Sequence, residues 1–117
     1  MDRDALADFL RRRRETLKPA DVGLPAGVRR RTTGLRREEV AQLTGMSVDY
    51  YGRLEQSRSP QPSPQMLRAL ARTLRLSEDE TDHLYRLAGH AVPDRTTHSD
   101  HVRPALLFVL DQLRDAA

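Results

Sequence analysis

Residues 37–57 contain two short helical patterns joined by a tight turn at Gly45. Ala41 is small enough to lie where two helices cross. Gly45, four residues later, can adopt the left-handed conformation that ends a helix, and Ser47 is a good N-cap for the next one. Three side chains fall at the positions expected to point inward: Val40, Tyr51 and Leu54. Small, turn and core positions together predict two helices that cross at a tight turn, a helix-turn-helix motif.

Helix signals continue on both sides of this motif. Ser63 precedes Pro64, which suits the first position of a helix, and Ser77 with Glu80 has the spacing of a capping box. No segment alternates convincingly with period two, so the predicted fold is all-α. The predicted helices cover about residues 2–17, 35–44, 48–56, 64–74 and 78–88.

The chain is predicted to divide into a helical domain over residues 1–89, a polar linker over 90–101 and a tail helix over 102–117. The tail contains a continuous apolar run, residues 105–110. On a helix such a run is apolar on nearly every side and needs cover on more than one face. We expect the tail either to pair with its mate across a twofold axis or to pack into a second domain.

Basic residues gather in the first half of the chain. Between residues 10 and 37, nine arginines and Lys18 oppose only Glu15 and Asp21, a local charge of +8, whereas residues 61–117 carry −1. A GC-rich genome would explain arginine over lysine, but it would not explain the clustering. The charge pattern predicts a surface that binds a polyanion.

Other classes of protein fit the sequence poorly. The chain has no cysteine, which excludes disulfides, thiolate zinc sites and cysteine nucleophiles. No run has the length of a membrane span, and the charged N-terminus does not resemble a signal peptide, so an intracellular, soluble protein is expected. We expect no cofactor, no metal site and no enzyme activity. The histidines do not have the spacing of helical ligand pairs: His83, His90, His98 and His101.

Residues 35–47 (LRREEVAQLTGMS), continued by residues 54–56, resemble the Xre family of λ-repressor-like helix-turn-helix regulators. The resemblance extends over about residues 5–88. It implies a five-helix λ-repressor-like DNA-binding domain, to which the predicted tail helix is added. Residues 18–34, with their prolines, glycines and arginine triplet, are similar to a bacterial branch in which an MmyB-like ligand-binding domain follows. Residues 103–107 resemble the start of that second domain, most of which is absent here.

The resemblance implies that the second helix of the motif, residues 48–56, lies in the major groove. Arg53 can donate two hydrogen bonds to guanine, and Val48 can contact a thymine methyl group. Asp49 either accepts from a cytosine amino group or pairs with Arg53 one turn away. Tyr50 either lies over the DNA backbone or reaches a base. The implied base-contacting residues are thus Val48, Asp49, Tyr50 and Arg53.

Phosphate contacts are implied around this helix, where they would fix the register on DNA without specifying sequence. Arg37 begins the first helix of the motif, and Gln56 and Arg58 follow the second. The triplet in the long connection is interpreted either as a basic arm on phosphates or the minor groove, or as a solvated loop. The triplet consists of Arg29, Arg30 and Arg31.

Arg14 and Glu55 are implied to form a structural ion pair between the first helix and the recognition helix. Two positions depart from the family. Arg36 stands where Ser or Thr usually caps the first helix of the motif, so an earlier start capped by Thr33 or Gly34 is an alternative. Ser57 stands where the family favours glycine. A left-handed serine there would cost about 1 kcal/mol, so a helix end that differs from that of the family is the alternative.

The favoured function is a sequence-specific DNA-binding transcriptional regulator. It would bind double-stranded DNA as a homodimer on an inverted repeat, in the bacterial cytoplasm at the nucleoid. A small-molecule effector is expected only through the missing C-terminal domain. The alternative is a protein-interaction module that uses the fold and the apolar tail without sequence-specific DNA binding. Arg53 and Arg37 discriminate between these functions, because the alternative gives them no role.

Overall fold

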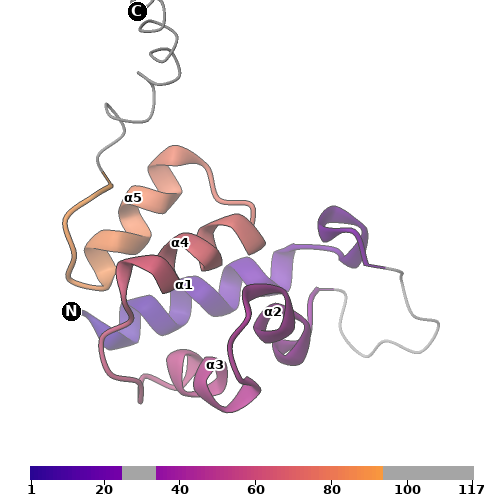
Figure 1. Cartoon of the computed structure of the whole chain (residues 1–117), viewed down its shortest axis with the longest axis horizontal. Helices are drawn as coiled ribbons and strands as arrows, with labels where there is room; N and C mark the ends of the chain where they lie inside the picture. The colour runs from indigo at the N-terminus through magenta and orange to yellow at the C-terminus, as the bar shows by residue number, and fades with distance from the viewer. Residues whose placement is uncertain (25–33, 94–117) are drawn as a thin grey trace, which may run out of the picture.

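The computed structural model describes residues 1–24 and 34–93 of the chain (Figure 1). This part contains helices and no strand, so the predicted all-α fold is confirmed. The predicted arginine arm, 29–31, and tail helix, 102–117, lie outside it. The helices are α1 (Arg3–Thr16), the short 3-10 helix η1 (Pro19–Val22), α2 (Arg37–Thr44), α3 (Val48–Glu55), α4 (Pro64–Thr73) and α5 (Glu78–Leu87).

Local capping fixes where most of these helices begin. The Ser47 hydroxyl accepts a hydrogen bond from the Tyr50 N–H at 3.0 Å, and Ser63 caps α4 in the same way. At α5, Ser77 accepts from the Glu80 N–H at 3.1 Å while the Glu80 carboxylate accepts from the Ser77 N–H at 2.8 Å. Each cap satisfies N–H groups that the first turn leaves without a partner.

Helix α2 begins at Arg37, the residue that the resemblance implied and two residues later than the helical pattern predicted. The Arg36 side chain makes no cap bond, but the Glu39 carboxylate accepts the Arg36 N–H at 2.7 Å. Just before it, the Leu35 N–H donates to the Arg14 carbonyl of α1 at 3.0 Å. Gly34 lies so close to α1 that a Cβ would come within 2.4 Å of the Glu15 carbonyl oxygen. The chain therefore returns against the end of α1 before α2 can start.

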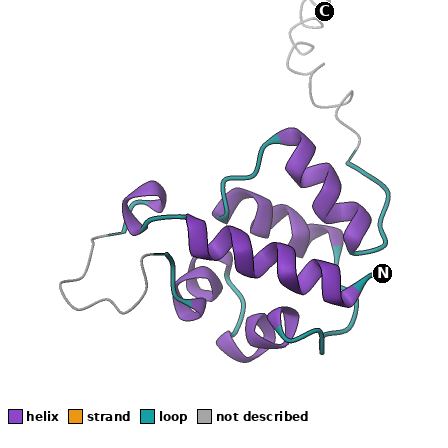
Figure 2. Cartoon of the chain, turned by 180° about the vertical axis from the view of Figure 1, so that it is seen from behind, coloured by secondary structure: helices purple, strands orange, loops and turns teal. Residues whose placement is uncertain are grey.

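Helix α1 crosses the middle of the molecule, with α3 on one side and α5 on the other (Figures 1 and 2). Helices α2 and α3 pack on each other, and α4 packs on both α2 and α5. All five α-helices contribute to one apolar core, which fixes the inner face of α3. Its most deeply buried side chains include Leu6, Leu10, Val40, Ala41, Tyr51, Leu54, Leu67, Leu70, Leu74 and Leu84.

Candidate nucleic-acid interface

The face of α3 opposite the core is open to solvent. Tyr51 and Leu54 hold the inner face, at 0% and 1% exposure, whereas Val48 is 50% exposed. The outer face borders a hollow of about 380 Å³. This hollow is lined by all but one of the described residues that were predicted to contact bases or phosphates. The exception is Tyr50. The lining consists of Arg37, Val48, Asp49, Gly52, Arg53, Gln56 and Arg58.

Positive charge dominates this hollow. Three arginines border it, against the single carboxylate of Asp49. The nearest oxygen of Asp49 lies 3.8 Å from Nη2 of Arg53, and both side chains are at least half exposed. A solvated pair at that separation is weak, so Arg53 stays available to another acceptor. At the far end of α3, Nη1 of Arg58 donates to Oε1 of Gln56 at 3.2 Å.

Tyr50 and Gly52 differ from the expectation. Tyr50 is half-buried, packs against the core, and does not line the hollow; burial raises the pKa of its phenol. Gly52 does line it, although sequence reasoning gave this glycine no role. A glycine inside a helix costs about 0.5–1 kcal/mol relative to alanine. A glycine in the middle of a predicted recognition helix is thus a sequence signal that could have identified Gly52 as a functional residue.

Glu55 lies at the back of the interface and joins it to α1. Its carboxylate is fully buried and accepts two hydrogen bonds from Arg14, from Nε at 2.6 Å and from Nη2 at 2.9 Å. Arg14 also donates to the Leu35 carbonyl at 2.9 Å. Nε of Arg37 donates to the same carboxylate at 3.0 Å, with the Arg37 side chain 42% exposed. One buried carboxylate thus connects a buried arginine to an arginine of the interface.

The helix-turn-helix domain family matches residues 5–84, more than half of the chain. The chain belongs to this family. No curated protein and no solved structure matches it. Membership in a helix-turn-helix family indicates a DNA-binding regulator. In the structure, α2 ends at Gly45, whose φ of 85° is left-handed, and α3 begins at Val48.

The chain just after α3 in this helix-turn-helix domain is left-handed although the residue there is a serine. Ser57 has a φ of 61°, and the Arg58 N–H donates back to the Arg53 carbonyl at 2.9 Å. The left-handed region is unfavourable for a residue with a Cβ by about 1–2 kcal/mol. The structure therefore has the left-handed residue that a glycine would supply at position 57, and Ser57 adopts it at the cost of local backbone strain.

The charge state of Glu55 depends on its two arginines. Burial of the carboxyl would raise its pKa, but the hydrogen bonds and charge of Arg14, together with the neighbouring Tyr51 phenol and a further bond from Arg37, outweigh burial and hold the pKa below its ordinary range. Burial and the nearby Glu55 carboxylate raise the pKa of the Tyr51 phenol. Glu55 is therefore ionised in the folded domain at neutral pH.

The helix-turn-helix domain is expected to lose stability as the pH falls below about 4.3, the ordinary pKa of glutamate. Because the pKa of Glu55 is lower in the folded state, the unfolded chain takes up the proton first, and the contribution of Glu55 is lost as pH falls towards its folded pKa. Urea unfolding between pH 6 and pH 3 measures this. Glu55→Gln should flatten the acid limb; an unchanged limb would contradict the assignment. Glu80, whose pKa the Ser77 N–H lowers, keeps its own contribution in both proteins.

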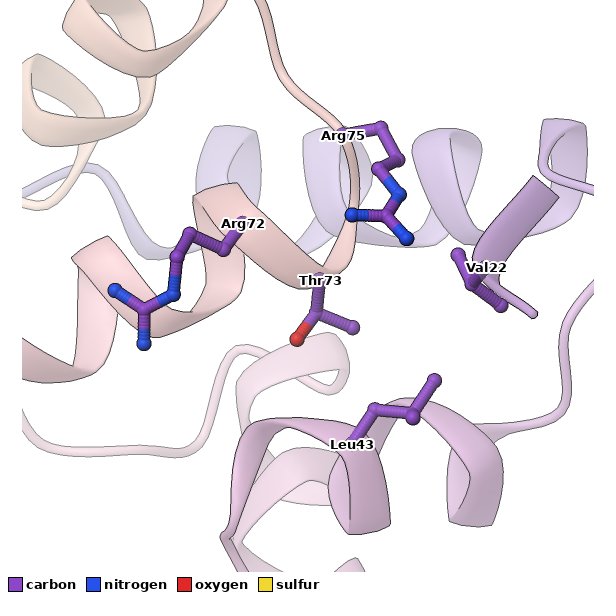
Figure 3. Close-up of a pocket in the computed structure, with 5 residues that line it drawn as sticks. All are labelled: Val22, Leu43, Arg72, Thr73 and Arg75. Atoms are coloured by element: carbon purple, nitrogen blue, oxygen red, sulfur yellow. The ribbon is translucent and has the colours of Figure 1, made fainter. Parts of the chain in front are cut away.

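A second hollow, of about 270 Å³, shares no residue with the first (Figure 3). It lies between η1, α2 and the end of α4, and Nε of Arg75 donates to the Asp21 carbonyl at its border, at 3.3 Å. Leu43 is 42% exposed there. This hollow supplies control positions for the experiments below. Its lining consists of Val22, Leu43, Arg72, Thr73 and Arg75.

The histidines that the structure describes have structural contacts. The His83 ring meets the Phe9 ring edge-on, with centroids 5.4 Å apart, and Nε2 of His90 lies 2.8 Å from the Pro62 carbonyl. Within residues 1–24 and 34–93, no group of three potential ligands could hold a metal ion. In the same ranges, no helix has both the length and the apolar character needed to cross a bilayer. His98 and His101 lie outside these ranges.

Proposed function

We propose that this chain is a sequence-specific transcriptional regulator of the Xre type, with α3 in the major groove of its operator. The observation that supports this most is the hollow over α3. It brings Val48, Asp49 and Arg53, which have the chemistry to contact base edges, next to Arg37 and Arg58, which have the chemistry to bind phosphates.

The proposal extends to a homodimer on an inverted repeat, since two copies of one recognition helix match a twofold-symmetric site. Tyr50 is assigned to the flanking DNA backbone because it lies beside the hollow rather than in it. The triplet Arg29–Arg31 is assigned to an arm on the phosphates. We further propose that any small-molecule effector acts through a C-terminal domain of the MmyB-like kind, and that the regulator works at the bacterial nucleoid in the cytoplasm.

The first experiment is selection from a randomised duplex library at near-physiological salt. We expect an enriched inverted repeat with half-sites about one helical turn apart. Retention that is salt-sensitive but enriches no sequence would contradict sequence-specific regulation. The chain would then be a basic protein-interaction module of the kind that the sequence allowed as an alternative.

Arg53→Ala is expected to weaken binding to the selected duplex by about 1–3 kcal/mol and to relax one base position. A guanidinium that donates to guanine discriminates that base from the others, so its loss affects one base position. Loss of a phosphate contact would weaken binding to all sequences alike. Binding titrations on the selected duplex and its single-base variants measure both effects.

The matched control is Arg72→Ala, which removes the same charge from an exposed residue of the second hollow. We expect it to change affinity less than about twofold, in line with a residue outside the contact surface. Equal losses in both variants would mean that net charge alone carries the binding, and base recognition by Arg53 would be wrong.

A further inference from the structure

Gly52 is a glycine that the fold itself does not require. Gly45 needs its left-handed φ of 85°, and Gly34 lies against the backbone of Glu15. Gly52 has neither constraint: it lies inside the eight-residue helix α3, and an added Cβ would meet no atom within 4 Å. An alanine would fit there and would favour the helix. Within the part of the chain that the structure describes, neither packing nor backbone conformation requires glycine at position 52.

The position of Gly52 indicates a reason for the glycine there. Gly52 lines the hollow over α3, so the missing side chain leaves free space on the surface assigned to DNA. Val48 lies one helical turn earlier and lines the same hollow, with half of its surface exposed. The other side chains around this space are charged or amide groups. Val48 and the bare backbone of Gly52 thus form a small apolar recess among polar groups.

We propose that this recess receives the C5-methyl group of a thymine in the operator. The thymine methyl is the apolar group on a base edge in the major groove, and a small apolar side chain is its usual partner. The inference rests on the proposed function and adds to it a specificity-determining residue that has no side chain. A Cβ at position 52 would occupy the space that the methyl group needs.

The first test compares the full chain with Gly52→Ala on the selected duplex. We expect the melting temperature to stay the same or rise by about 2–8 °C, because alanine favours the helix. We expect the affinity for DNA to fall by about 5–150-fold, because the recess is overfilled. The control, Gln65→Ala, places alanine at an exposed position of α4 and should leave affinity within about twofold.

The second test replaces each thymine of the duplex in turn by uracil, which removes only the methyl group. For the wild type, one position should lose about fourfold in affinity. Gly52→Ala should not respond at that position.

The outcomes separate the inference from the function on which it rests. A wild type that enriches no sequence overturns both. A wild type that selects an operator, with Gly52→Ala binding it equally well, overturns the recess alone. Weaker binding by Gly52→Ala without a uracil-sensitive position overturns the assignment to thymine.

Discussion

Glu55→Ala is expected to lower the free energy of unfolding by about 3–5 kcal/mol. The substitution leaves the guanidinium of Arg14 buried, and of the acceptors that it has among the described residues, the Leu35 carbonyl alone remains. It also releases Arg37 from the carboxylate that holds its Nε at 3.0 Å. Urea or thermal unfolding of the purified domain measures the loss, and DNA binding at a temperature where the variant is folded measures the effect on Arg37.

The control for this prediction is Glu38→Ala, on an exposed glutamate of α2. Losing a surface carboxylate should change stability by about 0.5 kcal/mol or less. If Glu55→Ala cost no more than Glu38→Ala, the ion pair between α1 and α3 would not hold the recognition helix in place.

Leu54→Ala is expected to destabilise the domain by about 2–5 kcal/mol. Leu54 is 1% exposed, and with Tyr51 it holds the inner face of α3 on the core. Shortening it leaves a cavity that a close-packed helical core fills only in part. The midpoint of urea unfolding should fall with little change in its slope.

Leu43→Ala provides the comparison within the same motif. Leu43 is 42% exposed at the second hollow, so its truncation should cost well under half as much as that of Leu54. Equal losses would mean that the second hollow is filled and that Leu43 belongs to the core.

Local signals made much of the fold predictable. Ser63 followed by Pro64, and Ser77 with Glu80, mark helix starts through bonds that span three residues. Gly45 marks a helix end through its φ. The helical pattern put the start of α2 at Leu35, two residues too early. In the structure the Leu35 N–H donates to the Arg14 carbonyl of α1, and the helix begins only after this contact. That contact depends on the tertiary fold.

The candidate site likewise contains residues that the sequence predicted and residues that only the structure revealed. The resemblance to the Xre family implied Val48, Asp49 and Arg53 as base-contacting residues, and in the structure these three line one hollow over α3. The bond from Arg37 to Glu55 was not predicted, since it depends on how α2 crosses α3. Gly52 was missed because periodicity is indifferent to a residue without a side chain, and the empty space around it exists only in three dimensions.

The tight contact of residues 34 and 35 with the end of α1 has a consequence for the connection that precedes it. Gly34 and Leu35 are held against α1 by their own contacts with Glu15 and Arg14. We therefore expect the length of the connection between α1 and α2 to have little influence on how the helices pack. Each doubling of such a connection costs only about 0.6 kcal/mol in closure entropy. Insertions or deletions between residues 24 and 34 are therefore expected to leave the five α-helices in place.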